Sequence, residues 1–161
     1  MNLKEEGISQ ELSNKTWVIE DATWRDFNQL FHLQKICFTP DDLWPFWDLI
    51  GILTLPGMVR LKAVIDDHMV GFLGGEKQAA RKIGWITNIA VMPAYRRLGI
   101  ARALLAECEE FFSGMRAVRL SVRATNDAAI QLYEGFGYEL VDRRKRYYTG
   151  GEDALVFEKS R

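Results

Sequence analysis

The stretch AVMPAYRRLGIARALLAECEEFF, residues 90–112, decides the fold of this chain. It overlaps the end of the apolar run IGWITNIAV, residues 83–91, which predicts a strand covered on both faces, and it continues as an amphipathic helix from Gly99. The first N–H groups of a helix lack intrahelical partners and attract anions. Gly99 permits a tight bend, and Ala101 has too small a side chain to block a phosphate. Three arginines add positive charge around the turn: Arg96, Arg97 and Arg102.

This junction predicts a diphosphate site, and two other phosphate-binding motifs fail at it. A P-loop needs GxxxxGK followed by Ser or Thr, whereas a dinucleotide-binding turn needs GxGxxG. Gly99 is the one glycine between residues 90 and 112, so neither pattern is present. The structural alternative is a strand-to-helix loop with solvated arginines.

The composition indicates one globular domain. The chain has 161 residues, of which 48% are hydrophobic, and this suits a single core. Its 21 basic and 22 acidic residues leave a net charge of −1, which does not favour nucleic acid or an anionic membrane as a partner. We expect residues 1–15, which are polar and aperiodic, to form a flexible leader, and residues 16–161 to form the domain.

Cysteine and histidine usage limits the chemistry further. Cys37 and Cys108 lie far apart in helical patterns, so we expect two small core residues in a reducing compartment and not a disulfide. His32 and His68 have no partners at metal-ligand spacing, so the sequence predicts no metal site. The sequence lacks an apolar signal peptide and a stretch long enough to cross a bilayer, so we expect a soluble, cytoplasmic protein.

Hydrophobic periodicity predicts a mixed α/β domain. The expected order is a strand, two helices, three strands, a helix, a strand, a helix and two strands, with Pro45 in the first turn of the second helix. The expected ranges are 16–20, 22–38, 41–53, 58–66, 69–78, 83–91, 99–112, 117–124, 126–136, 138–148 and 153–160.

Three segments carry a resemblance to a known family. RRLGIA, residues 96–101, matches the Arg/Gln-x-x-Gly-x-Gly/Ala signature of the GNAT superfamily of acyl-CoA-dependent N-acetyltransferases. SVRATNDAAIQLYEGFGYE, residues 121–139, resembles the second half of that fold, with Asn126 and Tyr133 at matching positions. RRKRYYTGGEDALVFEK, residues 143–159, resembles the C-terminal hairpin of protein N-terminal acetyltransferases. The chain is most similar to the ribosomal-protein alanine N-acetyltransferases of bacteria and their archaeal and eukaryotic relatives.

The resemblance implies a twisted, mostly antiparallel sheet of about seven strands with about four helices. Its central parallel pair is expected to splay and hold acetyl-CoA, whose pantetheine arm would bind the backbone of three residues: Ile89, Ala90 and Val91. The diphosphate would bind the turn and helix start formed by Arg96, Arg97, Leu98, Gly99, Ile100, Ala101 and Arg102. Asn126 would contact the same arm, a role compatible with capping its helix.

The resemblance also assigns the acid. Tyr133 occupies the family's general-acid position, and a tyrosine suits this task because its pKa near 10 exceeds that of the departing thiol, near 8.5. The alternative is an aromatic side chain on an apolar helix face.

The resemblance does not assign the general base directly. Bacterial alanine acetyltransferases carry a glutamate where this chain has Ser121, and a serine cannot act as a base unaided. Deprotonating an α-amine at pH 7 costs about 1.4 kcal/mol, against about 4.6 kcal/mol for lysine, so a weak base favours an N-terminal acceptor. Asp41 and Asp42, in the loop between the first two helices, are the candidates for the base, because related N-terminal acetyltransferases carry an acidic residue after a proline in this loop. We expect Asp42 instead to cap the second helix, whereas for Asp41 the roles of base and cap both stay open. Tyr147 and Tyr148 would line the acceptor's entry path or pack across strands.

The sequence therefore predicts transfer of acetyl from acetyl-CoA to a primary amine, with the N-terminal α-amine of a protein or peptide as the leading acceptor. Two alternatives stay open. One is acetylation of a small amine, such as a polyamine, aminoglycoside or amino-acid derivative. The other is an acyl-CoA-binding module without turnover. A monomer and a homodimer are equally compatible with the sequence.

Overall fold

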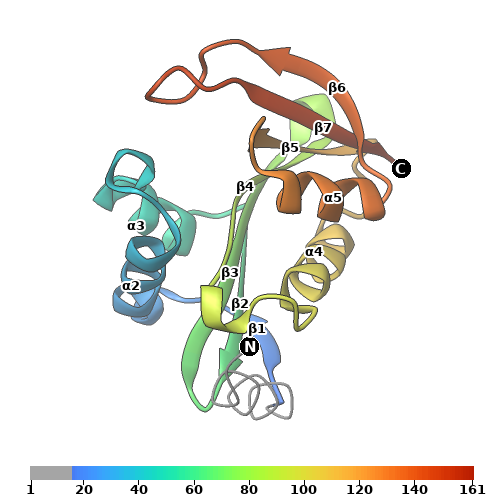
Figure 1. The fold of residues 1–161 in the computed structure, drawn as a ribbon. Helices are drawn as coiled ribbons and strands as arrows, with labels where there is room; N and C mark the ends of the chain where they lie inside the picture. Colours follow the sequence, from blue (N-terminus) through green and yellow to red (C-terminus); the bar gives the residue numbers. More distant parts are fainter. Residues whose placement is uncertain (1–15) are drawn as a thin grey trace.

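The computed structural model describes residues 16–161, and the leader expected at residues 1–15 lies outside them. One seven-stranded sheet crosses the molecule in the order β1-β2-β3-β4-β5-β7-β6 (Figure 1). Neighbouring strands run antiparallel except β4 and β5, which are parallel. The strands are β1 (Val18–Asp21), β2 (Met58–Ile65), β3 (His68–Gln78), β4 (Ile83–Val91), β5 (Ala117–Arg123), β6 (Glu139–Arg144) and β7 (Ala154–Ser160).

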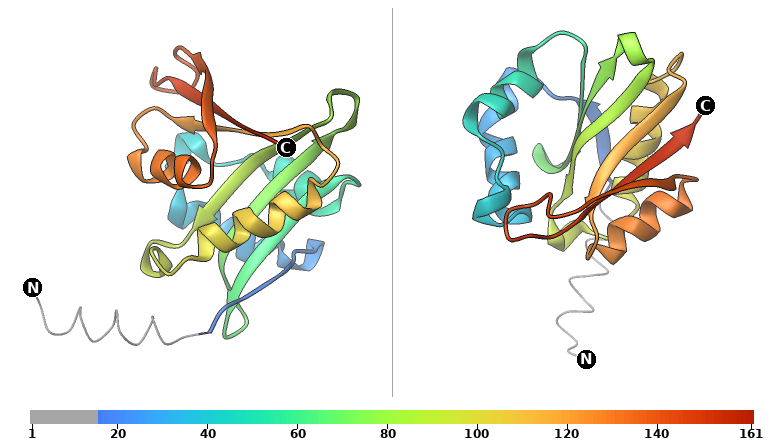
Figure 2. Two further views of the ribbon diagram at one scale, coloured as in Figure 1. Left: turned by 90° about the vertical axis from the view of Figure 1, so that its right-hand side faces the viewer. Right: turned by 90° about the horizontal axis from the view of Figure 1, so that it is seen from above.

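Four α-helices of the described chain cover the two faces of this sheet. They are α2 (Phe27–Cys37), α3 (Phe46–Thr54), α4 (Ile100–Phe111) and α5 (Asp127–Gly135). Figures 1 and 2 show α2 and α3 on one face, and α4 and α5 on the other. The predicted fold class is confirmed in strand number, helix number and the single parallel pair.

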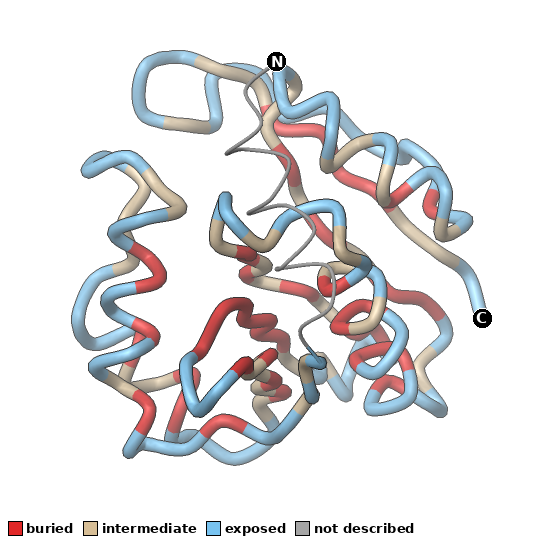
Figure 3. Tube along the Cα trace, turned by 60° about the horizontal axis from the view of Figure 1, so that its bottom comes forward, coloured by how far each residue is buried: buried red, intermediate tan, exposed pale blue. Residues whose placement is uncertain are grey.

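Each face of the sheet has its own hydrophobic core. The larger core, against α4 and α5, contains Leu104, Cys108 and Phe112, and the smaller core, against α2 and α3, contains Leu30 and Leu33. Figure 3 shows the buried positions along the strands and on the inward faces of the helices. Burial of Cys108 was expected and is confirmed, whereas Cys37 is only half-buried.

The ring of Phe112 packs directly on the backbone of two neighbouring strands. A Cβ atom added to Gly84 would lie 2.3 Å from Phe112 Cγ, and one added to Gly75 would lie 2.9 Å from Phe112 Cζ. These distances are too short for a real side chain, so the ring fits only because both positions are glycine. The contact fixes the end of α4 against β3 and β4.

A β-bulge at Thr87 changes which face the rest of β4 presents. Gly75 pairs with Ile86 and Gly74 pairs with Asn88, so Thr87 is the extra residue of β4. Before the bulge, Ile86 packs in the core of α4 and α5. After it, Ala90 packs in the core of α2 and α3. The bulge therefore reverses the alternation of side chains just where the parallel pair ends.

The parallel pairing of β4 with β5 is short. It runs from Ile83 and Ala117 to Ile86 and Leu120 and then stops, although β4 continues to Val91. Beyond Leu120, β5 stays paired with β7 through Arg123. The two strands thus form a fork, and the expected splay is confirmed.

Three predicted boundaries are wrong. The first helix, expected from residue 22, begins as the 3-10 helix η1 (Trp24–Asp26) and becomes α-helical at Phe27. The second helix, expected from residue 41, begins at Phe46, because residues 40–42 form the short 3-10 helix η2 (Pro40–Asp42) and Pro45 holds the residue before it out of the α conformation. The strand expected over residues 138–148 ends at Arg144. Arg146 has a φ of 52° and donates its N–H to Asp153 Oδ1 at 3.0 Å, which turns the chain into a loop.

Within residues 16–161, the longest helices are too short and too polar to cross a membrane.

Candidate active site

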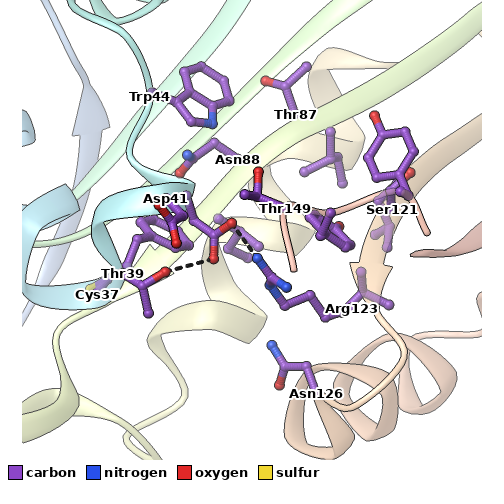
Figure 4. A pocket seen from close by; sticks show the side chains of 18 of the residues that line it. Cys37, Thr39, Asp41, Trp44, Thr87, Asn88, Ser121, Arg123, Asn126 and Thr149 are labelled. Atoms are coloured by element: carbon purple, nitrogen blue, oxygen red, sulfur yellow. Dashed lines mark hydrogen bonds and ion pairs between the residues drawn. The ribbon is translucent and has the colours of Figure 1, made fainter. Parts of the chain in front are cut away.

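A cavity of about 550 Å³ opens at the fork between β4 and β5. Its walls come from four places: the segment between α2 and α3, the strands at the fork, the start of α5, and the loop between β6 and β7 (Figure 4). Seven predicted site residues line it: Asp41, Ile89, Ser121, Asn126, Tyr133, Tyr147 and Tyr148. The fold therefore brings together residues separated by more than 100 positions in the chain.

The other predicted residues do not line this cavity. They continue from it along the end of β4 and around the start of α4: Ala90, Val91, Arg96, Arg97, Leu98, Gly99, Ile100, Ala101 and Arg102. The expected cofactor site thus divides into an enclosed end at the fork and an open turn at the helix.

The turn before α4 has the backbone geometry of an anion site. Arg97 and Gly99 have φ values of 63° and 83°, in the left-handed region, and α4 follows at once. The first intrahelical bond runs from Ala103 N to Gly99 O at 3.0 Å, so the N–H groups of Ile100 to Arg102 precede it. No side chain caps this helix, and a Cβ at Gly99 would meet nothing within 4 Å. Alternating left- and right-handed residues with free N–H groups form a concave nest for anions.

The three arginines at this turn differ in their contacts. Arg96 donates from Nε to Val91 O at 3.0 Å, so its side chain folds back on the end of β4. The guanidinium of Arg102 lies 4.9 Å from the centroid of the Phe136 ring. Arg97 is exposed. Arg97 is therefore the side chain left with the greatest freedom toward a ligand.

The backbone of β4 past the fork points in alternate directions. Met92 donates its N–H to Val70 O at 2.9 Å on the β3 side. Because successive strand residues direct their polar backbone groups to opposite sides, those of Ala90 face β3, and those of Ile89 and Val91 face the open side of the fork. Ile89 thus presents its N–H and C=O where β5 has moved away, and Val91 presents its N–H, because its C=O accepts from Arg96 Nε.

Tyr133 combines packing with an unpaired hydroxyl. The residue is only 4% exposed, and its ring lies 6.1 Å from that of Tyr138 and 6.4 Å from that of Phe157. Within residues 16–161 the hydroxyl has no hydrogen-bond partner, and the residue lines the cavity. Burial raises the pKa of the Tyr133 phenol above its ordinary value of 10, so the group stays protonated at neutral pH. It can donate a hydrogen bond into the cavity.

Asn126 caps α5, as the local pattern predicts. Its Oδ1 accepts a hydrogen bond from Ala129 N at 3.2 Å. This bond uses the acceptor end of the amide and leaves the NH₂ group for the cavity that Asn126 lines.

The two aspartates at the cavity differ in pairing. Asp42 forms an ion pair with Arg123 and accepts a hydrogen bond from Thr39 Oγ1 at 3.0 Å (Figure 4). Its expected role as a cap of the second helix is wrong, because α3 begins later, at Phe46. Asp41 is exposed and forms no ion pair with any described residue. Asp41 is therefore the acidic group of the cavity that is free to meet a cation.

The paired tyrosines lie in the loop between β6 and β7. Their rings are nearly perpendicular, at 85°, with centroids 5.1 Å apart. Tyr147 is exposed, and Tyr148 is half-buried beneath the guanidinium of Arg123, 4.2 Å from its ring centroid. Both line the cavity, so they are not packed across strands as the alternative interpretation proposed.

The site combines a splayed parallel strand pair with an anion nest at the N-terminus of α4. The sequence of the chain matches a known family. Residues 21–138 match the model of the Acetyltransferase (GNAT) family. The chain belongs to the GNAT acetyltransferases. The N-alpha-acetyltransferase RimI of Mycobacterium tuberculosis is 33% identical over 141 residues, which are 85% of this chain and 88% of that protein. A longer relative, ML0378 of Mycobacterium leprae, is 32% identical over 91% of this chain, and the match covers 41% of its own length.

Solved structures agree with the family. The ribosomal-protein-S18-alanine N-acetyltransferase from Escherichia coli superposes with a TM-score of 0.81 at 26% identity, over 90% of this GNAT chain and 94% of that one. Arabidopsis thaliana NAA60 in complex with acetyl-CoA also has a TM-score of 0.81, over 91% and 100% of the two chains. At 22% identity, the second likeness shows the shared fold.

Two buried hydroxyls mark the fork of this GNAT domain. Thr87 and Ser121 are the first residues of β4 and β5 past the last parallel pair, and both line the cavity. Thr87 Oγ1 and Ser121 Oγ are buried without a hydrogen-bond partner among residues 16–161. A buried hydroxyl without a hydrogen-bond partner costs folding free energy, so a polar ligand group that bonds these two hydroxyls would be stabilised at this end of the cavity.

Sequence reasoning missed four polar residues of the cavity region: Thr87, Asn88, Arg123 and Glu152. The adjacent glycines Gly74 and Gly75 could have indicated the bulge that positions Thr87, because glycine in a strand often marks one. The pairing of Arg123 with Asp42, 81 positions away, has no local signal. Among the described residues, no group of three or more His, Cys, Asp or Glu could hold a metal ion.

Proposed function

We propose that this GNAT protein transfers the acetyl group of acetyl-CoA to the α-amine at the N-terminus of a protein or peptide. The observation that carries the proposal is the fork, where the cavity opens between β4 and β5 with the unpaired Tyr133 hydroxyl in its wall. The related M. tuberculosis protein bears the name N-alpha-acetyltransferase, which supports the same acceptor class.

The residues at the fork fit acetyl-CoA. The backbone groups of Ile89 and the N–H of Val91 pair with the amides of the pantetheine arm, and Asn126 contributes its NH₂ group. The diphosphate takes the N–H groups at the start of α4, with Arg97 nearby. Backbone donors suit this task because they are fixed before the ligand arrives, which lowers the entropy lost on binding.

Tyr133, which the resemblance assigns as the general acid, is the proposed hydrogen-bond donor to the leaving thiolate. The acceptor amine attacks the carbonyl carbon of the thioester, the C–S bond breaks, and the thiolate leaves with the electron pair. The Tyr133 hydroxyl donates a hydrogen bond to that sulfur as negative charge develops on it. Because burial raises the pKa of Tyr133 above that of the thiol, the proton stays on the phenol oxygen, and the thiolate takes its proton from the nitrogen of the new amide, directly or through water.

Asp41 is the proposed base, because it is the unpaired carboxylate at the cavity. An α-ammonium group loses its proton at a cost of about 1.4 kcal/mol at pH 7, so a carboxylate acting directly or through water is sufficient. Ser121 and the two tyrosines of the β6–β7 loop, Tyr147 and Tyr148, are proposed to bind the acceptor through their hydroxyl groups and rings.

A thiol-release assay tests the function. Acetyl-CoA is combined with peptides that begin with Ala, Ser or Met, with lysine peptides whose N-termini are blocked, and with free polyamines and amino-acid derivatives. Turnover of the free N-terminal peptides is expected. Turnover confined to small amines would show that the acceptor is a small amine and not a protein N-terminus. Binding of acetyl-CoA without any turnover would favour a non-catalytic module.

We also propose a cytoplasmic location, with the chain acting as a monomer or a homodimer. Size-exclusion chromatography with light scattering distinguishes a monomer from a homodimer.

A further inference from the structure

The guanidinium of Arg123 joins segments from opposite walls of the cavity. Its Nη1 donates to Glu152 Oε2 at 2.7 Å in the β6–β7 loop, and its Nη2 donates to Asp42 Oδ1 in η2. The same group lies over the ring of Tyr148. Figure 4 shows Arg123 reaching from β5 toward the segment of Thr39 and Asp41.

Threonines complete this arrangement at both ends. Thr39 Oγ1 donates to Asp42 Oδ2 at 3.0 Å, and Thr125 Oγ1 donates to Glu152 Oε1 at 3.0 Å. Each carboxylate thus gives one oxygen to Arg123 and the other to a threonine. We call these five side chains the Arg123 clasp: Thr39, Asp42, Arg123, Thr125 and Glu152.

The clasp requires arginine. A guanidinium is planar and offers donors in several directions, so it can bind two carboxylates and stack on a ring at once, whereas an ammonium group is a compact charge. The hydrogen bond with Arg123 lowers the pKa of Glu152, and that with Glu152 raises the pKa of Arg123. The side chains of Arg123 and Asp42 are 25% and 20% exposed, so water screens their pairing only in part.

The clasp also determines which charge the acceptor meets. Two aspartates lie side by side at the cavity, and the ion pair with Arg123 satisfies Asp42. Asp41 has no such partner among the described residues. A cationic amine entering the cavity therefore finds one unpaired carboxylate in this segment.

We propose that Arg123 is a positioning residue for the acceptor. By holding Asp42 and Glu152, it sets the distance between residues 39–44 and residues 147–152, the two sides of the acceptor's path, and leaves Asp41 as the carboxylate that receives the ammonium group. This inference rests on the proposed function, because that function makes the cavity an acceptor site.

The chain offers a matched control on the same strand. Arg119 lies four residues before Arg123 on β5 and forms an ion pair with Glu158 on β7. Its side chain is similarly exposed, at 33%, but it does not line the cavity. Arg119→Gln therefore removes a comparable ion pair from β5 without touching the acceptor's path.

Steady-state kinetics on the full chain, with acetyl-CoA and an Ala-starting peptide, test the proposal. Arg123→Gln is expected to raise the KM for the peptide about tenfold, equivalent to about 1.4 kcal/mol, and to change the KM for acetyl-CoA less than about twofold. Arg123→Lys should recover only part of the effect, and Arg119→Gln should match the wild type. An unchanged peptide KM in Arg123→Gln, or equal changes in the two arginine variants, would overturn the proposal.

Hydrogen–deuterium exchange gives a second readout that needs no activity. Exchange of the segments 39–44 and 147–152 is expected to increase together in Arg123→Gln and to stay at the wild-type level in Arg119→Gln. If the wild type acetylates no peptide, the proposed function fails, and the exchange data still decide whether Arg123 holds both walls. Unchanged exchange in both segments would refute the clasp even in an active enzyme.

Discussion

Gln34 and Asn88 bind each other through their side-chain amides across the interface between α2 and β4. Gln34 Nε2 donates to Asn88 Oδ1 at 3.3 Å, and Asn88 Nδ2 donates to Gln34 Oε1 at 3.5 Å. Both residues are buried, at 1% and 7% exposure. The pair joins the first helix of one layer to the strand that forms the fork.

Gln34→Leu should destabilise the protein by about 1–3 kcal/mol, because it leaves the buried amide of Asn88 unsatisfied. Urea denaturation followed by circular dichroism measures the loss. Replacing both residues by leucine should cost less than the sum of the two single changes, since no amide is then left unpaired. Simple additivity of the two losses would contradict a direct interaction.

Tyr133→Phe should lower kcat by about 10²-fold or more and leave the affinity for acetyl-CoA nearly unchanged, because the ring keeps its packing and only the hydrogen-bond donor is lost. Stopped-flow thiol release gives the rate, and calorimetry gives the affinity. Tyr138→Phe is the matched control, since its hydroxyl bonds Glu109 at 3.0 Å in the core. Equal rates in Tyr133→Phe and the wild type would show that the hydroxyl does not stabilise the leaving thiolate.

Gly99→Ala should raise the KM for acetyl-CoA, because alanine at a φ of 83° strains the turn that aims the N–H groups of α4. The left-handed conformation costs an L-residue about 1–2 kcal/mol, so a shift of about tenfold is expected. Gly114→Ala is the control: Gly114 has a φ of 84°, lies beyond the other end of α4, and also has open space around it. Similar KM values in the two variants would argue against a diphosphate site at Gly99.

Gly84→Ala should cost about 3 kcal/mol or more of folding stability, because the added methyl group would overlap the Phe112 ring in a core that cannot expand. Gly51→Ala provides the contrast. Its Cβ would lie 3.5 Å from Leu55 Cδ1 inside α3, so it should stabilise the helix by about 0.5–1 kcal/mol. Denaturation midpoints moving in the same direction in both variants would contradict the packing of Phe112 on Gly84.

Asp26 should make stability fall in acid. Burial opposes ionisation of its carboxyl, but hydrogen bonds from Thr23 N at 2.8 Å and Lys62 Nζ at 2.9 Å outweigh it and lower the pKa below the ordinary 3.8. Because the folded pKa is the lower one, the stabilisation is complete above pH 3.8 and is lost as the pH falls through the folded value. Asp26→Asn should therefore be less stable than the wild type at pH 7, and the difference in stability should close as the pH falls below the lowered pKa of Asp26 in the folded protein. A difference independent of pH would show that the charge is not responsible.

The sequence predicted most of the fold, because each strand and helix carries its own periodic pattern and turn residues. The predicted boundaries are wrong where contacts with residues far away in the sequence determine the local structure. The loop before α3 contains residues compatible with a helix, but Pro45 restrains the chain before it, and tertiary contacts such as Asp42 with Arg123 hold the segment. The end of β6 has strand-forming tyrosines, yet the bond from Arg146 to Asp153 turns the chain earlier.

The site residues likewise fall into those that a local sequence pattern predicts and those that depend on distant partners. The turn around Gly99 is a local motif, so its geometry follows from the sequence. Tyr133 and Asp41 come from separate elements, and a family resemblance was needed to place them at one cavity. No pattern within a few residues of Arg123 could reveal the clasp, because its carboxylates lie 81 and 29 positions away.

Because of the extra residue at Thr87, the number of residues in β4 matters as much as which residues they are. Deleting Thr87 would turn every later side chain of β4 to the opposite face of the sheet. Asn88 would then leave Gln34 and point into the hydrophobic core beneath α4, and Val91 would leave that core. A homologous strand one residue shorter must therefore carry the reverse order of polar and apolar side chains. Sequence comparison across relatives should reveal that inverted order wherever the adjacent glycines are missing.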